Sequence, residues 1–145
     1  MVFFTSDQHY YHGNIIDLCG RPFGSVEEMN KALIKEHNRV VSPDDFVYHL
    51  GDFSFGTKLR TKEILGQLNG IHRLIMGNHD RAHSVSWWMD CGFNRVYDEP
   101  ILLDKFFLLS HEPLEWVVNK PFNSFYGHVH NRADMVHTTN NSCIS

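Results

Sequence analysis

Short apolar runs, each ending in a cluster of polar side chains, constrain the fold of this chain more than any other feature. The runs have the length and composition of buried β-strands. The polar clusters that follow them are Asp7-Gln8-His9, Gly51-Asp52, Gly77-Asn78-His79-Asp80, Ser110-His111 and Gly127-His128-Val129-His130. In open α/β sheets, ligands bind beyond the carboxyl ends of the strands. We therefore expect a sheet protein whose polar clusters meet at one edge.

Predicted helices alternate with these strands in the first half of the chain. Ser25 with Glu28 three residues later forms a capping box, which predicts the start of a long helix. Residues 57–68 and 84–91 are also predicted to be helical, whereas residues 8–23 are expected to form a loop. Alternating strands and helices favour parallel pairing, and the strand-rich second half favours antiparallel pairing. The expected result is a set of mixed sheets with helices outside.

Size and charge narrow the class of protein. The 145 residues fit one domain covering residues 1–145. A net charge of -4 gives no basic balance for tight binding to nucleic acid. No run of about 18 apolar residues occurs, so no membrane partner is expected. The N-terminus lacks the basic and long apolar regions of a signal peptide, which predicts a cytoplasmic location.

The side chains in the polar clusters favour a metal site. Carboxylates, imidazoles and an amide are the ligands that hard-to-borderline divalent cations prefer. Each residue alone is an ordinary polar loop residue, and only their joint presence at strand ends indicates a metal-dependent hydrolase. Three widely separated cysteines without a C-x-x-C pattern argue against a cysteine zinc site.

The order of the clusters resembles the calcineurin-like metallophosphoesterase family, in particular its small bacterial and phage members. The resemblance is carried by D-x-H at Asp7 and His9, G-D at Gly51-Asp52, G-N-H-D at residues 77–80, a lone His111, G-H-x-H at residues 127–130, and the stretches Tyr11-His12-Gly13-Asn14-Ile15-Ile16 and Arg21-Pro22-Phe23. It implies an α/β/β/α sandwich of two mixed β-sheets flanked by helices.

The resemblance also implies a role for each side chain in a site with two divalent ions. One ion would take Asp7, His9 and His130, the other would take Asn78, His111 and His128, and Asp52 would bridge them. His79 would stay off the metals and protonate the leaving oxygen, and Asp80 would orient His79. Manganese is the first candidate for the ions, with iron, zinc, nickel and magnesium as alternatives.

The implied activity is hydrolysis of phosphate mono- or diesters by in-line attack of a metal-bridging hydroxide. Two alternatives remain open: a non-catalytic metal-binding scaffold of the same fold, and a nuclease, for which nucleic acid is a partner only as substrate. His12, Asn14 and Arg21 are candidates for binding the substrate phosphate, although Arg21 could instead pair with a carboxylate. No oligomeric state is predicted.

Several residues outside the clusters are expected to be structural. Trp87 and Trp88 should anchor a short helix against the core. His37 and His49 lie within a predicted helix and strand and carry no signature of a ligand. The region from Met135 onward is expected to supply one closing strand.

Overall fold

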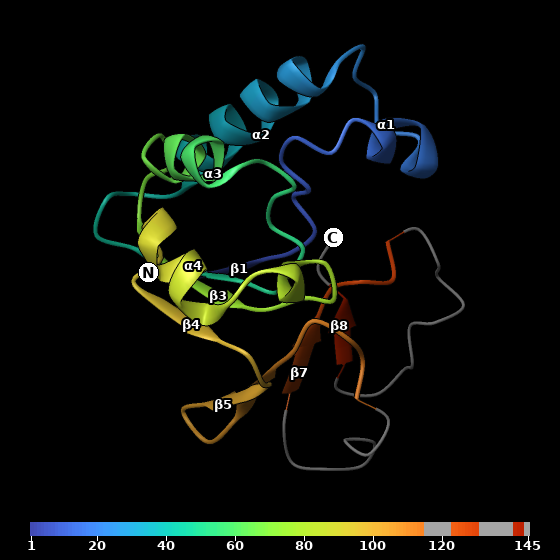
Figure 1. Cartoon of the computed structure of the whole chain (residues 1–145). Helices are drawn as coiled ribbons and strands as arrows, with labels where there is room; N and C mark the ends of the chain where they lie inside the picture. The colour runs from blue at the N-terminus through green and yellow to red at the C-terminus, as the bar shows by residue number, and fades with distance from the viewer. Residues whose placement is uncertain (115–122, 131–140, 144–145) are drawn as a thin grey trace.

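Two four-stranded sheets flanked by helices form the fold, which belongs to the mixed α/β class (Figure 1). The computed structural model describes residues 1–114, 123–130 and 141–143. All neighbours in the first sheet are parallel, which confirms the pairing expected for the first half. Its strands, in spatial order, are β1 (Val2–Thr5), β2 (Phe46–His49), β3 (Ile71–Ile75) and β4 (Arg95–Tyr97).

The second sheet has a different pairing from the one we expected. Its strands, in order, are β5 (Ile101–Leu103), β6 (Phe107–Leu109), β7 (Asn123–Tyr126) and β8 (Asn141–Cys143). The β5–β6 pair is antiparallel, but β6–β7 and β7–β8 are parallel. The chain between β6 and β7 is long enough for a crossover, and a short strand's side-chain pattern does not encode its direction. Strand β8 lies in the predicted closing region, of which residues 135–140 and 144–145 fall outside the described ranges.

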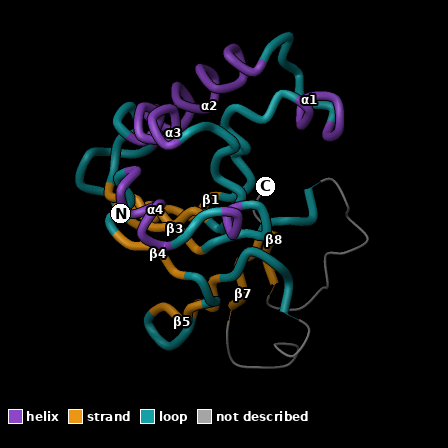
Figure 2. The backbone as a smooth tube through the Cα atoms, in the orientation of Figure 1, coloured by secondary structure: helices purple, strands orange, loops and turns teal. Residues whose placement is uncertain are grey.

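The helices of the described ranges all precede β4 in the chain (Figure 2). Helices α1 to α3 lie on the opposite side of the first sheet from β5, β7 and β8 in Figure 1. The helices are α1 (Asn14–Cys19), α2 (Val26–Val40), α3 (Lys58–Leu65) and α4 (Val85–Cys91), with a 3-10 helix, η1, at Asp80–Ala82. A second helical layer beside β5–β8, which the resemblance implies, is not among these elements.

Side-chain caps explain where three of the helices begin. Ser25 Oγ accepts a hydrogen bond from the Glu28 backbone N–H at 3.2 Å, as the capping box predicts. Thr57 and Ser84 cap α3 and α4 in the same way. Helix α1 corrects the expected loop over residues 8–23: it is only six residues long, too short to show helical periodicity, and a left-handed Gly20 ends it.

Two apolar clusters lie on opposite faces of the first sheet. One joins β3 to α3 and α4 and contains the fully buried Trp88, which confirms that this residue anchors the short helix. The other lies between the sheets, where Tyr48 and Ile75 meet Leu109. The first sheet is thus fixed from both sides, so the loops at its carboxyl edge start from rigid strands.

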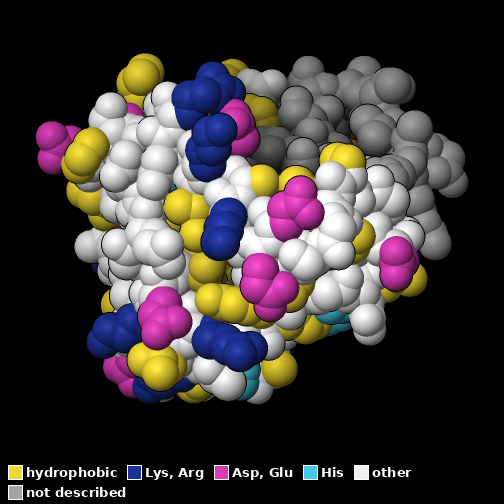
Figure 3. All heavy atoms as spheres, turned by 90° about the horizontal axis from the view of Figure 1, so that it is seen from above, with side chains coloured by type: hydrophobic (Ala, Val, Ile, Leu, Met, Phe, Trp, Pro, Cys, Tyr) yellow, Lys and Arg dark blue, Asp and Glu magenta, His cyan; other side chains and the backbone are white. Residues whose placement is uncertain are grey.

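Charges of both signs are mixed on the surface seen in Figure 3, which views the molecule from above Figure 1. Lys and Arg side chains lie among Asp and Glu side chains there. No helix of the described ranges is long and apolar enough to cross a membrane.

Candidate metal centre

The loops that follow β1 and β2 run side by side beyond the sheet. The Asp7 backbone N–H donates to Gly51 O at 3.1 Å, and the His9 N–H donates to Asp52 O at 3.0 Å. A further bridge joins Tyr10 to Ser54. The parallel pairing of the strands therefore continues into the loops and holds the first two polar clusters together.

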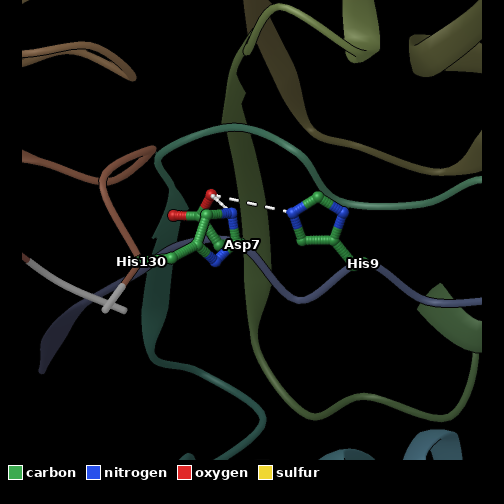
Figure 4. A group of neighbouring side chains, drawn as sticks. All are labelled: Asp7, His9 and His130. Atoms are coloured by element: carbon green, nitrogen blue, oxygen red, sulfur yellow. Dashed lines mark ion pairs between the residues drawn. The ribbon is translucent and has the colours of Figure 1, made fainter. Parts of the chain in front are cut away.

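Asp7, His9 and His130 form a compact group of potential metal ligands (Figure 4). Their ligand atoms all lie within 4.8 Å of one another. Asp7 Oδ1 is 3.5 Å from His130 Nε2 and 3.8 Å from His9 Nε2. The sequence separation is large, but the fold brings together the three residues that were predicted to share an ion.

Two buried polar atoms of this group are placed as the ligands of a cation would be. Asp7 Oδ2 accepts hydrogen bonds from Ser6 Oγ at 2.5 Å and from the His128 N–H at 2.9 Å. Asp7 Oδ1 and His9 Nε2 are buried and have no hydrogen-bond partner among the described residues. Buried polar atoms are rarely left unpaired, and here the two face the same point as His130. The donor set therefore fits a divalent ion.

A second group contains Asp52, His111 and His128. His111 Nδ1 donates to Leu50 O at 2.7 Å, so His111 Nε2 is the ring nitrogen that faces the group. That Nε2 lies 3.1 Å from His128 Nδ1 and 3.0 Å from Asn78 Oδ1. The structure therefore gathers the predicted second set, including the Asn78 amide oxygen.

Asp52 lies between the two groups. Its Oδ2 is 3.7 Å from His9 Nε2 and 3.5 Å from His111 Nε2. Its Oδ1 accepts the His79 backbone N–H at 3.1 Å. One oxygen thus fixes the loop and the other faces both groups, so the position expected of a bridging carboxylate is reached through Oδ2 alone.

Buried charges shift the pKa values of the central residues. Burial opposes ionisation of Asp7 and Asp52, but hydrogen bonds and nearby histidines outweigh it and lower both carboxyl pKa values. Burial also opposes protonation of His111, but the hydrogen bond and attraction of Asp52 raise its pKa to about 9. The two carboxylates are therefore ionised and attract positive charge to this point.

The backbone at the candidate ligands is strained. Asp7, His9, Asp52, His128 and His130 all have positive φ, between 46° and 69°. Non-glycine residues rarely adopt this left-handed region, and such outliers cluster at functional sites. Their concentration at five candidate ligands supports a functional role for the arrangement.

The structure places His79 and Asp80 in different environments. The His79 side chain is 48% exposed, and its Nε2 lies 3.9 Å from Asp52 Oδ2. The buried Asp80 carboxylate accepts backbone N–H groups from Asp52 at 2.7 Å, Gly77 at 2.9 Å and Phe53 at 3.1 Å. Burial raises the pKa of Asp80 to about 6, in part offset by the Gly77 hydrogen bond. Asp80 therefore joins two loops, and its orienting of the His79 ring stays a prediction.

The three candidates for substrate contact lie in different environments in the structure. The His12 ring lies at the centre, with its Nδ1 3.2 Å from His9 Nδ1. Arg21 donates to the Asp7 and Gln8 carbonyl oxygens at 2.6 and 2.9 Å, so it holds the first loop instead of pairing with a carboxylate. Asn14 is exposed on α1.

Sequence reasoning missed two residues of the centre. The first is Ser6, which orients Asp7. Position 127, which packs against Ser6, must be glycine, because a β-carbon there would overlap Ser6 Oγ and Asp7 Oδ2. Phe55 is 41% exposed and stacks on His9 and His12. The glycine of the G-H-x-H pattern was an indirect signal for Ser6, because a glycine can mark a close approach of another residue. Nothing in the sequence singled out Phe55.

Comparisons with known proteins found similar sequences and a similar solved structure. No model of a known protein family matches it. It is 49% identical over 82 residues to uncharacterized protein MJ1445 of Methanocaldococcus jannaschii, a match that covers 55% of this chain and 47% of that protein. It is 37% identical over 88 residues to the gene 66 protein of Mycobacterium phage L5, covering 59% and 42% of the two chains. The chain thus matches less than half the length of these relatives.

A solved structure shares the whole fold. The protein of unknown function AQ665 from Aquifex aeolicus is similar over 99% of this chain and 88% of its own, with a TM-score of 0.72 and 29% sequence identity. The class that fold and site define is therefore a mixed α/β protein with His and Asp groups that could hold metal ions.

Proposed function

We propose that this chain is a calcineurin-like metallophosphoesterase that hydrolyses phosphate mono- or diesters with two divalent metal ions. The observation that carries the proposal is the position of Asp52 Oδ2 between two convergent ligand groups, 3.7 Å from His9 Nε2 and 3.5 Å from His111 Nε2. A single structural ion needs one closed ligand set. Two sets that share one carboxylate are what a two-ion phosphoryl-transfer site requires.

The ligands themselves define how the charge is balanced. Asp7 and Asp52 bring two negative charges, and the histidines and Asn78 are neutral when they act as ligands. Two divalent ions, when bound, would supply Lewis acidity and an activated water as the nucleophile. Their charge exceeds that of the two carboxylates, so a protein of net charge -4 would present a local positive site to phosphate.

His79 is suited to act on the substrate. Its ring is half exposed, whereas its backbone N–H is held by Asp52 Oδ1. An imidazole in reach of solvent and next to the reacting centre can donate a proton to a leaving alkoxide. We assign His79 this role, and we assign Asp80 the positioning of the loops that carry Asp52 and His79.

The proposal is tested by coupling metal content to turnover. Purified protein is stripped with chelator, reloaded with manganese, iron, zinc, nickel or magnesium, and assayed with 4-nitrophenyl phosphate and bis(4-nitrophenyl) phosphate. Bound metal is measured by mass spectrometry. We expect up to two ions per chain and hydrolysis only after reloading. Full hydrolysis by the stripped protein would contradict the proposal.

Matched histidine variants separate catalysis from metal binding. His79→Gln should keep both ions and lose turnover, because its side chain is not assigned as a ligand. His83→Gln removes another exposed histidine, one that stacks on Trp87, and should change neither property. Two bound ions without turnover of any ester, in the original protein as in His79→Gln, would instead favour the non-catalytic scaffold.

A further inference from the structure

Phe55 is a large apolar side chain exposed beside the candidate metal centre. Its side chain is 41% exposed. The ring stacks on His12 with 4.0 Å between centroids, and its centroid lies 4.9 Å from that of His79 and 5.4 Å from that of His9. Single exposed apolar residues are common on protein surfaces. This one is informative because the imidazoles around it belong to the site.

The backbone holds the Phe55 ring in a fixed place. The Phe55 N–H donates to Tyr10 O at 2.8 Å, and the Tyr10 N–H donates to Phe53 O at 2.9 Å. Tyr10 and Phe53 are fully buried and their rings pack together at 5.1 Å. The core is therefore filled by the neighbours of Phe55, and Phe55 itself is presented outward from a rigid loop. A pre-organised ring loses little entropy when it binds a ligand.

We propose that Phe55 and His12 form an aromatic subsite that stacks on a planar ring of the substrate's leaving group. The inference rests on the proposed function, in which His79 donates a proton to the leaving oxygen. A group attached to that oxygen must pass His79, and the Phe55 ring is a direct neighbour of His79. The substrate class is thus an aromatic phosphate ester, and its ring is either a nucleobase or an aryl group.

The experiment compares substrates that differ in the aromatic ring. Adenosine 5′-monophosphate and ribose 5-phosphate share a phosphorylated ribose, but only the first has a base. 4-Nitrophenyl phosphate tests the aryl source. Phosphate release is measured for the original metal-loaded protein and for Phe55→Ala, Phe55→Leu and Phe55→Trp. Phe106→Ala is the matched control, because Phe106 is 48% exposed and precedes β6, at the opposite end of that strand from His111.

We expect Phe55→Ala to lower kcat/KM for at least one aromatic ester by about 5- to 150-fold, the range found when a base-stacking aromatic is replaced by alanine. Ribose 5-phosphate should change by less than about twofold, since it offers no ring to stack. Phe55→Trp should retain the preference and Phe55→Leu should lose it, because leucine keeps apolar bulk without an aromatic face. Phe106→Ala should change nothing.

The outcomes separate this inference from the proposed function. A loss on 4-nitrophenyl phosphate alone supports the subsite and assigns it to aryl esters, and a loss on the nucleotide assigns it to nucleobases. Equal losses on all three esters, no loss on either aromatic ester, or full activity of Phe55→Leu would overturn the subsite while leaving the phosphoesterase intact. If the original protein hydrolyses none of the three esters, calorimetry compares its affinity for adenosine 5′-monophosphate with its affinity for ribose 5-phosphate. Equal affinities would overturn the subsite too.

Discussion

Two buried histidines behind the site should make the fold sensitive to acid. His72 Nε2 lies 3.4 Å from Leu68 O, so this nitrogen carries the hydrogen and His72 Nδ1 is left to accept from His49 Nε2 at 3.0 Å. His49 Nδ1 is buried without a hydrogen-bond partner among the described residues. Both rings are therefore neutral in the folded protein. A proton added to either would be buried without a counter-charge.

The magnitude follows from the pKa of His72. Burial lowers this pKa from 6.5 to about 4. Above the unfolded value neither state is protonated, and below it the unfolded chain binds a proton that the folded protein does not. Stability is thus present above the unfolded pKa and is lost as pH falls toward the folded pKa. Linkage gives a loss of about 2 kcal/mol in the free energy of unfolding between about pH 7 and pH 5.

Urea unfolding at several pH values, in chelator so that metal binding does not contribute, measures this loss. His72→Gln keeps a donor for Leu68 O and an acceptor for His49 but does not titrate, so its stability should fall by about 2 kcal/mol less than that of the original protein over the same interval. His83→Gln, a change at an exposed ring, should keep the full acid loss. An equal loss of stability in the original protein and in His72→Gln would refute the reasoning.

Three further changes test the site. Asp52→Asn should bind less metal and lower kcat/KM by more than about 100-fold, because changes to residues outside the ligand set already lower metal affinity or activity by about 10- to 100-fold. Metal analysis and phosphate release measure both effects. Unchanged metal content would refute the bridging position. Asp80→Asn turns an NH₂ group toward backbone donors, so urea unfolding should show a loss of about 3 kcal/mol in the free energy of unfolding. Lost turnover at unchanged stability would instead favour the role of Asp80 in orienting His79. Gly127→Ala should destabilise the fold by about 2 kcal/mol and displace Asp7, whereas Gly13→Ala, which meets nothing within 4 Å, should not.

Strands and the positions of their polar ends could be predicted from the sequence because both depend on local pattern. An apolar run that stops at a polar cluster is typical of a strand followed by a loop, and β1, β2 and β3 each end two residues before one of the first three clusters or its first ligand residue. The meeting of the clusters at one edge followed from the same rule, since parallel strands end at a common edge, whereas the division into two ligand groups was implied by the family resemblance. Pairing direction in the second sheet did not, because it depends on where the chain crosses over.

The roles of Arg21 and Asp80 show what a sequence pattern leaves out. Both are charged residues near the site, and by type alone they suggest contact with phosphate or with a histidine. In the structure both bind the main chain: Arg21 holds the Asp7 carbonyl oxygen, and Asp80 holds the Asp52 N–H. A hydrogen bond to the main chain puts no demand on the identity of the residue it reaches, so no partner residue in the sequence reveals it.

The hydrogen bonds of Arg21 and Asp80 to the main chain stabilise the backbone at the candidate ligands. Asp7 and Asp52 sit at φ values near 55°, where a non-glycine backbone is disfavoured. Strained residues persist only where their surroundings determine them completely. Arg21 and Asp80 supply that constraint from the protein itself, independent of any bound ion. We therefore expect the metal-free protein to keep its ligand loops in place, so that a cation enters a site that is already formed.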